Sequence, residues 1–220
     1  MLIILLSVIV ILSYAVLHIL TISSFGARVA GRISKRPALG TTLSITAFSL
    51  SRFIVLVFLP SLAFLVENGI TINNYLILAL SSYILTFILS SIMLIKLNNV
   101  QRFFQTVFIK YNESTFPIAL LKSLSFKKTD LNLKNCESFT FDKVIPKKTS
   151  VSFLAYIFLI TGFFNAFMLA VLFPENRLTL SQFTAIFHGF GAIIFAFYLD
   201  PMLSRSIDTY SDEVTWLKNV

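Results

Sequence analysis

The stretch that decides the fold is LIILLSVIVILSYAVLHILTISSF at residues 2–25, an apolar run without a charged residue. At a rise of 1.5 Å per residue, about 20 residues of helix cross the hydrocarbon core of a bilayer. No Lys or Arg precedes the run and a basic cluster follows it, which is the reverse of the order in a secretory signal peptide. We therefore expect a membrane-spanning helix that is kept in the protein, with its amino end outside.

The composition of the whole chain leads to the same class of protein. Of the 220 residues, 56% are hydrophobic and only 13% are charged, and the mean hydropathy is +0.85. A soluble domain carries about 25% charged residues, so a soluble enzyme and a disordered chain are both excluded. The single cysteine, Cys136, excludes a disulfide framework and a multi-cysteine metal site.

Four further stretches have the length and apolar character of a span: residues 38–66, 75–95, 151–173 and 178–199. Sixteen of the 18 Lys and Arg lie after the first and third spans and in the tail at residues 200–220. Basic residues concentrate on the cytoplasmic side, so we predict an outside amino end and a cytoplasmic carboxyl end. The fold class is then all-α, a polytopic transmembrane helix bundle in one membrane domain. Its net charge of +8 marks this sidedness and favours anionic membrane lipids over nucleic acid as partners.

The polar region at residues 96–149 begins with the pattern of an amphipathic helix. Apolar positions recur three and four residues apart opposite polar ones: Val100, Phe103, Phe104, Val107, Phe108 and Tyr111 against Gln101, Arg102, Gln105 and Lys110. Pro117 should begin a second short piece over residues 118–126, and we expect both pieces at the cytoplasmic interface. A re-entrant pair or a sixth span over residues 103–124 is the alternative, although charged residues interrupt it.

One charged residue, Arg52, falls at the midpoint of a predicted span, about 21 Å of helix from either end of residues 38–66. A charge at this depth costs roughly 2.5 to 3.5 kcal/mol on insertion scales, so the guanidinium must face protein or water. On a helical wheel it shares one arc with four neighbours: Thr41, Ser44, Phe48 and Ser51. We favour a functional role for this polar face. The alternative is a structural role, in which Arg52 ties helices together through backbone carbonyls.

The first span carries a similar stripe if its helix continues past the membrane, formed by His18, Thr21, Phe25, Arg28 and Arg32. The stripe would point three potential cations toward the cytoplasmic mouth, but Arg28 and Arg32 also fit ordinary snorkelling anchors. His188 lies near the middle of residues 178–199, where an interhelical hydrogen bond is the commoner role of a histidine. Asn165, within residues 151–173, fits a polar contact between helices.

No Asp or Glu occurs within any of the five predicted spans. The ionisable residues of the membrane core, Arg52, His18 and His188, are thus neutral or positive, which suits an anion. Proton-coupled cation exchange usually relies on buried carboxylates, and a metal site needs more ligands than two distant histidines. The sequence also lacks a Gly-x-Ser-x-Gly elbow, a His-Glu-x-x-His helix and a P-loop. We therefore expect neither an enzyme nor an ATP-driven pump, and no metal or cofactor.

Residues 18–52 read HILTISSFGARVAGRISKRPALGTTLSITAFSLSR. Their characteristic features are His18, Ser23-Ser24, Arg28 with Ala30-Gly31, Ala38 and Ser49-x-Ser51-Arg52. Together they resemble the opening of the Amj family, alternate lipid II flippases of the bacterial cytoplasmic membrane. After the last span Asp200-Pro201, Leu203-Ser204 and Asp208 resemble the closing Asp-Pro segment of that family. The two blocks cover about a third of the chain, and the five spans found here differ from the six expected for the family.

The resemblance implies a flippase that moves undecaprenyl-diphosphate-linked disaccharide peptide from the inner to the outer leaflet for peptidoglycan synthesis. Arg52 would be the central phosphate contact, and Arg28 and Arg32 would capture the lipid on the cytoplasmic side. The full set of expected substrate contacts is Arg52, Arg28, Arg32, His18, Ser51, His188 and Asn165. Asp200, Pro201 and Gly31 would have structural or gating roles.

Two other functions remain open from the sequence. The first is a non-transport scaffold or assembly partner in envelope biogenesis, whose basic loop at residues 96–148 binds another envelope protein or anionic lipid. The second is an intramembrane lipid-phosphate hydrolase that uses His188, which the missing nucleophile disfavours. The scaffold predicts that the loop matters and that Arg52 does not.

Overall fold

The computed structural model describes residues 1–124 and 146–209, and every regular element in these two ranges is helical. The elements are α1 (Leu2–Ile33), α2 (Pro37–Glu67), α3 (Ile72–Ile95), α4 (Leu97–Tyr111), α5 (Phe116–Leu124), α6 (Pro146–Leu172), the 3₁₀ turn η2 (Pro174–Asn176), α7 (Arg177–Ser181), α8 (Phe183–Ile194), the π-helical turn η3 (Phe195–Leu199) and α9 (Asp200–Thr209). Cys136 and the Lys- and Asn-rich loop around it lie outside the described residues.

Five helical stretches are long and apolar enough to cross a membrane: Leu2–Ile33, Pro37–Glu67, Ile72–Ile95, Thr149–Leu172 and Pro174–Arg205. Their outward faces are apolar, with large exposed side chains such as Phe53, Leu56 and Phe87. A soluble protein rarely exposes so much contiguous apolar surface. The predicted all-α helical bundle is therefore confirmed, and the chain is a multi-pass membrane protein.

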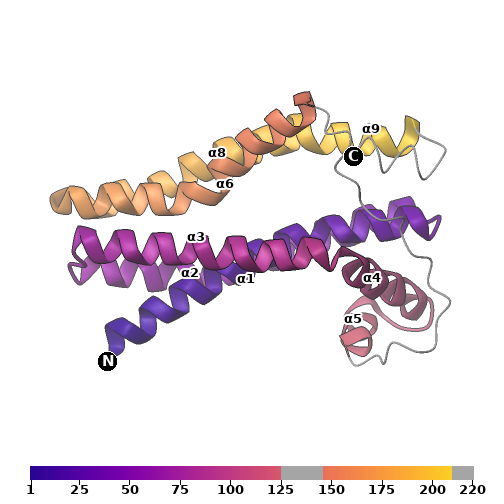
Figure 1. The fold of residues 1–220 in the computed structure, drawn as a ribbon, viewed down its shortest axis with the longest axis horizontal. Coiled ribbons are helices and arrows are strands. Elements are labelled where there is room, and N and C mark those ends of the chain that lie inside the picture. Colours follow the sequence, from indigo (N-terminus) through magenta and orange to yellow (C-terminus); the bar gives the residue numbers. More distant parts are fainter. Residues whose placement is uncertain (125–145, 210–220) are drawn as a thin grey trace.

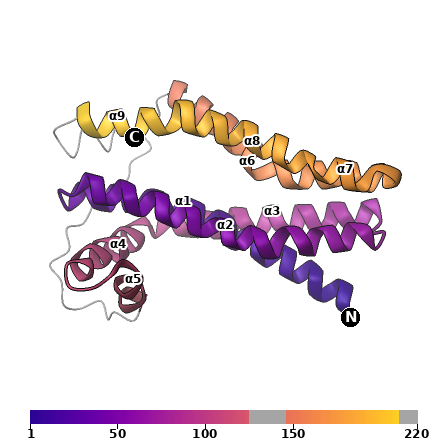
Figure 2. The same ribbon diagram turned by 180° about the vertical axis from the view of Figure 1, so that it is seen from behind.

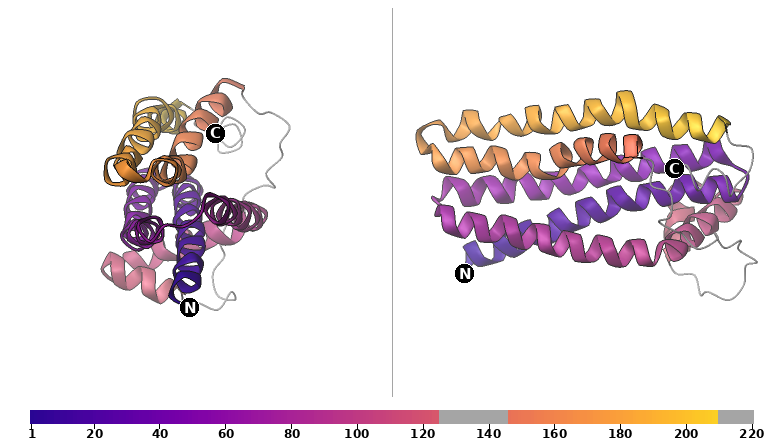
Figure 3. Two further views of the ribbon diagram at one scale, coloured as in Figure 1. Left: turned by 90° about the vertical axis from the view of Figure 1, so that its left-hand side faces the viewer. Right: turned by 45° about the horizontal axis from the view of Figure 1, so that its top comes forward.

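The long helices form two layers that run side by side (Figures 1 and 2). One layer holds α1, α2 and α3, and the other holds α6 together with the nearly continuous helix from α7 to α9, as the end-on view in Figure 3 shows. Three side-chain to backbone hydrogen bonds join the layers: Tyr14 to Ile160 at 2.7 Å, Tyr75 to Phe164 at 2.6 Å and Arg177 to Glu67 at 3.0 Å. Both tyrosines are fully or nearly fully buried, and burial is tolerated because each hydroxyl donates to a carbonyl.

Aromatic packing fills the space between the layers. The rings of Tyr14, Phe58 and Phe164 meet with centroids 4.9 to 5.8 Å apart, in the tilted and edge-on arrangements that aromatic pairs prefer. All three side chains are inaccessible to solvent or nearly so. In lipid the apolar surface gains little from burial, so close packing of this kind and the interhelical hydrogen bonds hold the layers together.

Gly31 marks the closest approach of α1 and α2. A Cβ atom at this position would lie 2.5 Å from the Cα atom of Gly40, so only glycine permits this crossing. The turn that follows is a Schellman motif: Arg36 N donates to the Gly31 carbonyl at 2.7 Å and Lys35 N to the Arg32 carbonyl at 3.0 Å. Lys35 takes the required left-handed conformation, with φ of 56°, and Pro37 then begins α2. The predicted structural role of Gly31 thus has a definite geometric basis.

Two helices extend beyond the predicted spans. Helix α1 continues to Ile33, eight residues past the predicted limit at residue 25, because its glycines pack against neighbours and do not break it. The last helix passes residue 199 and continues through α9 to Thr209. Pro201 stands in the first turn of α9 directly after the π turn η3. A π turn widens the hydrogen-bond ring, and this irregularity accommodates the N–H that Pro201 lacks. Asp200 therefore lies within a long helix and not in a separate tail.

Helix α4 packs beside α1, and α5 packs against α4, at the end of the bundle that also contains the α1–α2 turn and α9 (Figure 1). With 15 and 9 residues, each is shorter than the roughly 20 that a span needs, so the described part of residues 103–124 forms two short helices instead of a sixth span. The apolar side of α4 is buried at Phe104, Val107 and Phe108, as predicted. Gln101 and Gln105, on the opposite side of the helix, are also buried, which the periodic pattern of α4 alone does not predict.

Candidate functional site

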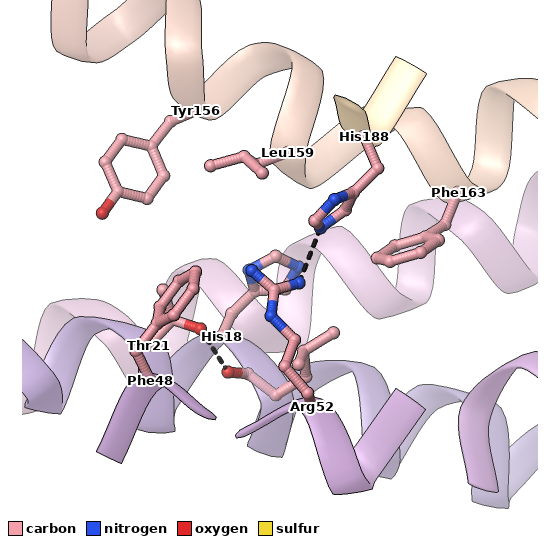
Figure 4. A pocket seen from close by; sticks show the side chains of 9 residues that line it. His18, Thr21, Phe48, Arg52, Tyr156, Leu159, Phe163 and His188 are labelled. Atoms are coloured by element: carbon pink, nitrogen blue, oxygen red, sulfur yellow. Dashed lines mark hydrogen bonds between the residues drawn. The ribbon is translucent and has the colours of Figure 1, made fainter. Parts of the chain in front are cut away.

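Three polar residues lie at the middle of three different long helices. Arg52 is the central residue of α2 (Pro37–Glu67), His18 is next to the centre of α1 (Leu2–Ile33), and His188 is next to the centre of the stretch Pro174–Arg205. In α2 about 22 Å of helix lies on either side of Arg52. The structure brings these three residues to one pocket between the layers (Figure 4). The structure thus brings together the three ionisable residues that the sequence placed in the membrane core.

Arg52 reaches across the layers from α2 to α8, as Figure 4 shows. Its Nη1 atom lies 2.7 Å from Nε2 of His188. Because a guanidinium can only donate, His188 accepts through Nε2 and carries its proton on Nδ1, so this histidine is neutral. The guanidinium carbon also lies 4.3 Å from the centre of the Phe48 ring, in a cation–π contact. No carboxylate contacts Arg52 within residues 1–124 and 146–209.

His18 faces the same pocket from α1 and leaves one ring nitrogen unused. Its Nε2 atom is buried without a hydrogen-bond partner, and 6% of the residue is exposed. The ring packs edge-on against Tyr14, with centroids 4.5 Å apart. Buried polar atoms are normally paired, so this nitrogen is a spare donor or acceptor, according to its tautomer, beside the Arg52 charge.

Nine residues from both layers line the pocket: Leu17, His18, Thr21, Phe48, Arg52, Tyr156, Leu159, Phe163 and His188. The space between these side chains that a water-sized group can occupy is about 10 Å³, roughly the room for one water molecule. The pocket is therefore nearly closed in this conformation, and it combines one fixed positive charge with mostly apolar walls.

Ser51 stands next to Arg52 in sequence but faces a different neighbour. It is fully buried, its hydroxyl donates to the Phe48 carbonyl at 2.7 Å, and it accepts from the Thr21 hydroxyl at 3.4 Å. The first bond stays within α2, and the second joins α2 to α1. Ser51 was predicted to contact the substrate, but the structure places it at this helix contact and not in the lining of the pocket.

Arg28 differs most from its expected position. It was expected to be a solvated capture residue, but only 6% of it is exposed. One amino group forms an ion pair with Asp200 of α9, and Nε donates to the Ser44 hydroxyl at 3.2 Å. No Asp or Glu lies within the five predicted spans. In the structure, however, α9 continues the helix of the fifth span through Asp200, so that helix does carry a carboxylate. Arg28 and Asp200 thus link the two layers near one end of the bundle.

The remaining predicted residues are distributed around the molecule. Arg32 is half-buried near the end of α1, outside the pocket lining. Asn165 is exposed on the outer side of α6 and donates from Nδ2 to the Thr161 hydroxyl at 3.1 Å, because its position on the helix faces away from α1 and α2. Pro201 is exposed at the start of α9. The predicted substrate contact at Asn165 is therefore not part of the pocket.

Tyr156 is a pocket residue that the sequence analysis did not identify. Its hydroxyl is buried without a partner, and its ring meets that of Phe25 edge-on at 6.5 Å. Within an aromatic-rich span nothing in the sequence distinguishes this tyrosine from Tyr14 or Tyr75, whose hydroxyls are satisfied. Only the position of α6 against α1 shows that it lines the pocket.

Comparisons of the chain with protein-family models, curated proteins and solved structures found no significant match. The resemblance to the Amj family therefore stays a prediction that depends on the residues quoted above. The function must be argued from the pocket itself.

Proposed function

We propose that this protein is a flippase that carries the phosphate-bearing headgroup of a polyprenyl-diphosphate-linked glycan across a bacterial cytoplasmic membrane, with lipid II as its substrate. The observation that carries the proposal is Arg52, a cation at the centre of the bundle without a carboxylate partner in the described residues. Its hydrogen bond to His188 uses one N–H group, and the guanidinium forms no other hydrogen bond to a described side chain. The remaining donors suit two oxygens of a phosphate.

The surroundings of Arg52 favour an anion over a cation. His18 and His188 add nitrogen atoms but no negative charge, and low dielectric around the pocket strengthens attraction to an anion. An arginine that only tied helices together would be expected to bond to backbone carbonyls, but within the described residues Arg52 contacts the His188 ring and the Phe48 ring. An anion is also the part of a polyprenyl-diphosphate lipid that cannot cross the hydrocarbon core unaided.

The position of the pocket between two layers supports a transport path. A headgroup held between α1–α2 and α6–α8 could pass along the seam while the lipid tail stays in the surrounding bilayer. The pocket has room for about one water molecule as it stands, so entry of the headgroup requires the layers to move apart. Rocking of one helical layer against another around a fixed site is a common mechanism of transporters.

The proposed sidedness places α4, α5, α9 and the α1–α2 turn in the cytoplasm. Most of the basic residues described at the ends of the bundle lie at this end, including Arg36, Lys96 and Lys122, as the positive-inside rule expects. The amino end of α1 and the turns after α2 and α6 would then be outside. The proposal makes the protein a transporter and not an enzyme.

The direct test is replacement of a known flippase. The gene is expressed in a bacterium depleted of its own lipid II flippases, and growth and the fraction of lipid II on the outer leaflet are measured. The wild-type protein should restore both, whereas Arg52→Ala at equal membrane abundance should restore neither. Lys96→Ala is the matched control, because it removes an exposed basic residue at a helix end and should leave translocation unchanged.

A scaffold role is the second candidate, and one observation favours it. Helices α4 and α5 expose apolar side chains, Ile109, Tyr111, Ile118 and Leu121, next to Lys110 and Lys122. Such a surface could bind an anionic membrane or a partner protein. Under this role, variants of these side chains would abolish the phenotype while Arg52→Ala would be tolerated, so the same strain separates the two functions.

A further inference from the structure

The ion pair that joins the layers is incomplete on its arginine side. Arg28 is 94% buried, since only 6% of the residue is exposed. Its Nη2 pairs with Asp200 and its Nε donates to Ser44, but Nη1 is buried without a partner among the described residues. The buried hydroxyl of Tyr156 also lacks a partner among the described residues, and its ring packs edge-on against Phe25, one helical turn before Arg28 on α1, with centroids 6.5 Å apart. Asp200 therefore leaves two buried polar groups unsatisfied.

The depth of Arg28 matches the level of lipid phosphates. Arg28 lies about 16 Å along α1 from the middle of that helix, and half of the hydrocarbon core of a bilayer is about 15 Å. The Asp200 side chain is 36% exposed while that of Arg28 is 7% exposed. An incoming anion would thus reach the Asp200 carboxylate before it reaches Arg28. The carboxylate oxygen that pairs with Arg28 occupies the position that a phosphate oxygen would take on the guanidinium.

We propose that Arg28 and Tyr156 form a capture site for the phosphate groups of a lipid, and that binding displaces the Asp200 carboxylate and releases α9 from α1. The proposal rests on the flippase function above and adds its first step. A diphosphate offers more oxygens than one carboxylate, so it can accept from Nη1 and from the Tyr156 hydroxyl, which Asp200 leaves unpaired. Displacement is an exchange of partners on Arg28 and breaks no covalent bond.

Release of α9 would reach the central pocket through stacked rings. Five residues before Asp200, Phe195 stacks on Phe48 with centroids 5.8 Å apart and planes 8° apart. Phe48 in turn carries the Arg52 guanidinium on its ring. The stacked pair involves η3, the π turn, which is the irregular part of the helix and so its easiest point to bend. Capture of a lipid phosphate at Arg28 would therefore separate the two layers where they meet beside Arg52.

Binding is measured on the purified full chain in nanodiscs of zwitterionic lipid, with farnesyl diphosphate as the lipid probe. Tyr156→Phe should fold normally, because the lost hydroxyl has no partner, and should bind the probe about tenfold more weakly. Asp200→Asn should bind it about tenfold more tightly, since a competing charge is removed. Unchanged affinity in Tyr156→Phe, or weaker binding in a folded Asp200→Asn protein, would overturn the proposal.

A charge exchange separates capture from a purely structural ion pair. The double variant Arg28→Asp with Asp200→Arg keeps an ion pair between α1 and α9 but moves the cation away from Tyr156. It should regain thermal stability relative to Arg28→Asp alone and still fail to bind farnesyl diphosphate. Binding equal to that of the wild type would show that the pair is structural only.

Two competitors identify the part of the probe that is recognised. Inorganic diphosphate should compete with farnesyl diphosphate, because the phosphate groups are the part that is bound. If it does not compete, the farnesyl tail alone accounts for the affinity, and the proposed site is contradicted. Phosphatidylglycerol should compete weakly, and equal competition would replace the proposal with a general anionic-lipid site. These measurements need no translocation, so loss of flipping in Arg52→Ala and loss of capture in Tyr156→Phe are independent results.

The release of α9 has its own readout. Fluorescent labels are placed at Lys35 and Arg205, both exposed, in a Cys136→Ser background. Farnesyl diphosphate should increase the distance between the labels in the otherwise unchanged chain, and Asp200→Asn should show the larger distance without ligand. An unchanged distance on saturation would refute the displacement of Asp200.

Discussion

Replacing Arg52 with alanine should remove transport while changing the amount of folded protein little. The substitution relieves a charge at mid-membrane depth, which is unfavourable by roughly 2.5 to 3.5 kcal/mol on insertion scales. It also removes the Phe48 cation–π contact, worth about 0.5 to 2 kcal/mol, and the hydrogen bond to His188, worth about 1.5 to 3 kcal/mol for a charged donor. The two sides nearly cancel, so the net change in stability should be within about 2 kcal/mol.

The assay measures membrane abundance and lipid II translocation on the same variant. Arg52→Ala should be present at a level similar to the wild type and should translocate no lipid II. Arg52→Lys keeps the charge but replaces the planar fork with a point charge, so it should recover translocation only in part. A stable Arg52→Ala protein that remains fully active would refute the anion-site reasoning. Low abundance with normal activity per molecule would instead assign Arg52 a structural role.

Three further predictions concern packing, topology and the outer surface. Gly31→Ala should destabilise the detergent-solubilised protein by about 1 to 3 kcal/mol, because a Cβ atom would lie 2.5 Å from a backbone atom of α2; Gly189→Ala, which meets no atom within 4 Å, is the control and should not destabilise it. A cysteine at Asn73 should react with an impermeant reagent outside intact cells while one at Lys35 should not, and the reverse pattern would invert the topology. Asn165→Ala should retain full translocation, since its side chain is exposed and outside the pocket; lost translocation at normal abundance would place Asn165 on the path.

The sequence was sufficient for the helices because the membrane leaves few choices. Long apolar runs must satisfy their backbone internally, so hydropathy alone identified five spans, and the charge at Arg52 identified a polar centre without any knowledge of packing. The contacts between the residues of that centre could not be predicted from the sequence. His188 could be placed at mid-depth but not assigned to Arg52, because sequence spacing does not say which helices are neighbours.

The errors have the same physical origin. Asp200 was placed in a tail because apolar character ends at Leu199, whereas the helix continues by hydrogen bonding and brings Asp200 to Arg28. Asn165 was included among the substrate contacts because a polar residue within a span usually faces protein. The rotation of α6 turns it outward instead, and no residue pattern within that helix reports this rotation.

In the proposed mechanism, Arg28 and Arg52 hold the anion at different stages. Arg28 has an anionic partner and lies near the depth of lipid phosphates, so it can exchange one anion for another with little change in charge. Arg52 has no carboxylate in the described residues and lies where an unpaired charge is most costly, so it gains most from a ligand that brings negative charge. A headgroup that leaves Arg28 for Arg52 therefore returns Asp200 to its partner while it neutralises the central cation. On this reasoning the ion pair between Arg28 and Asp200 re-forms once the headgroup has moved to Arg52. The first step runs from Arg28 to Arg52, because before the substrate binds Arg28 has an anionic partner and Arg52 has none in the described residues.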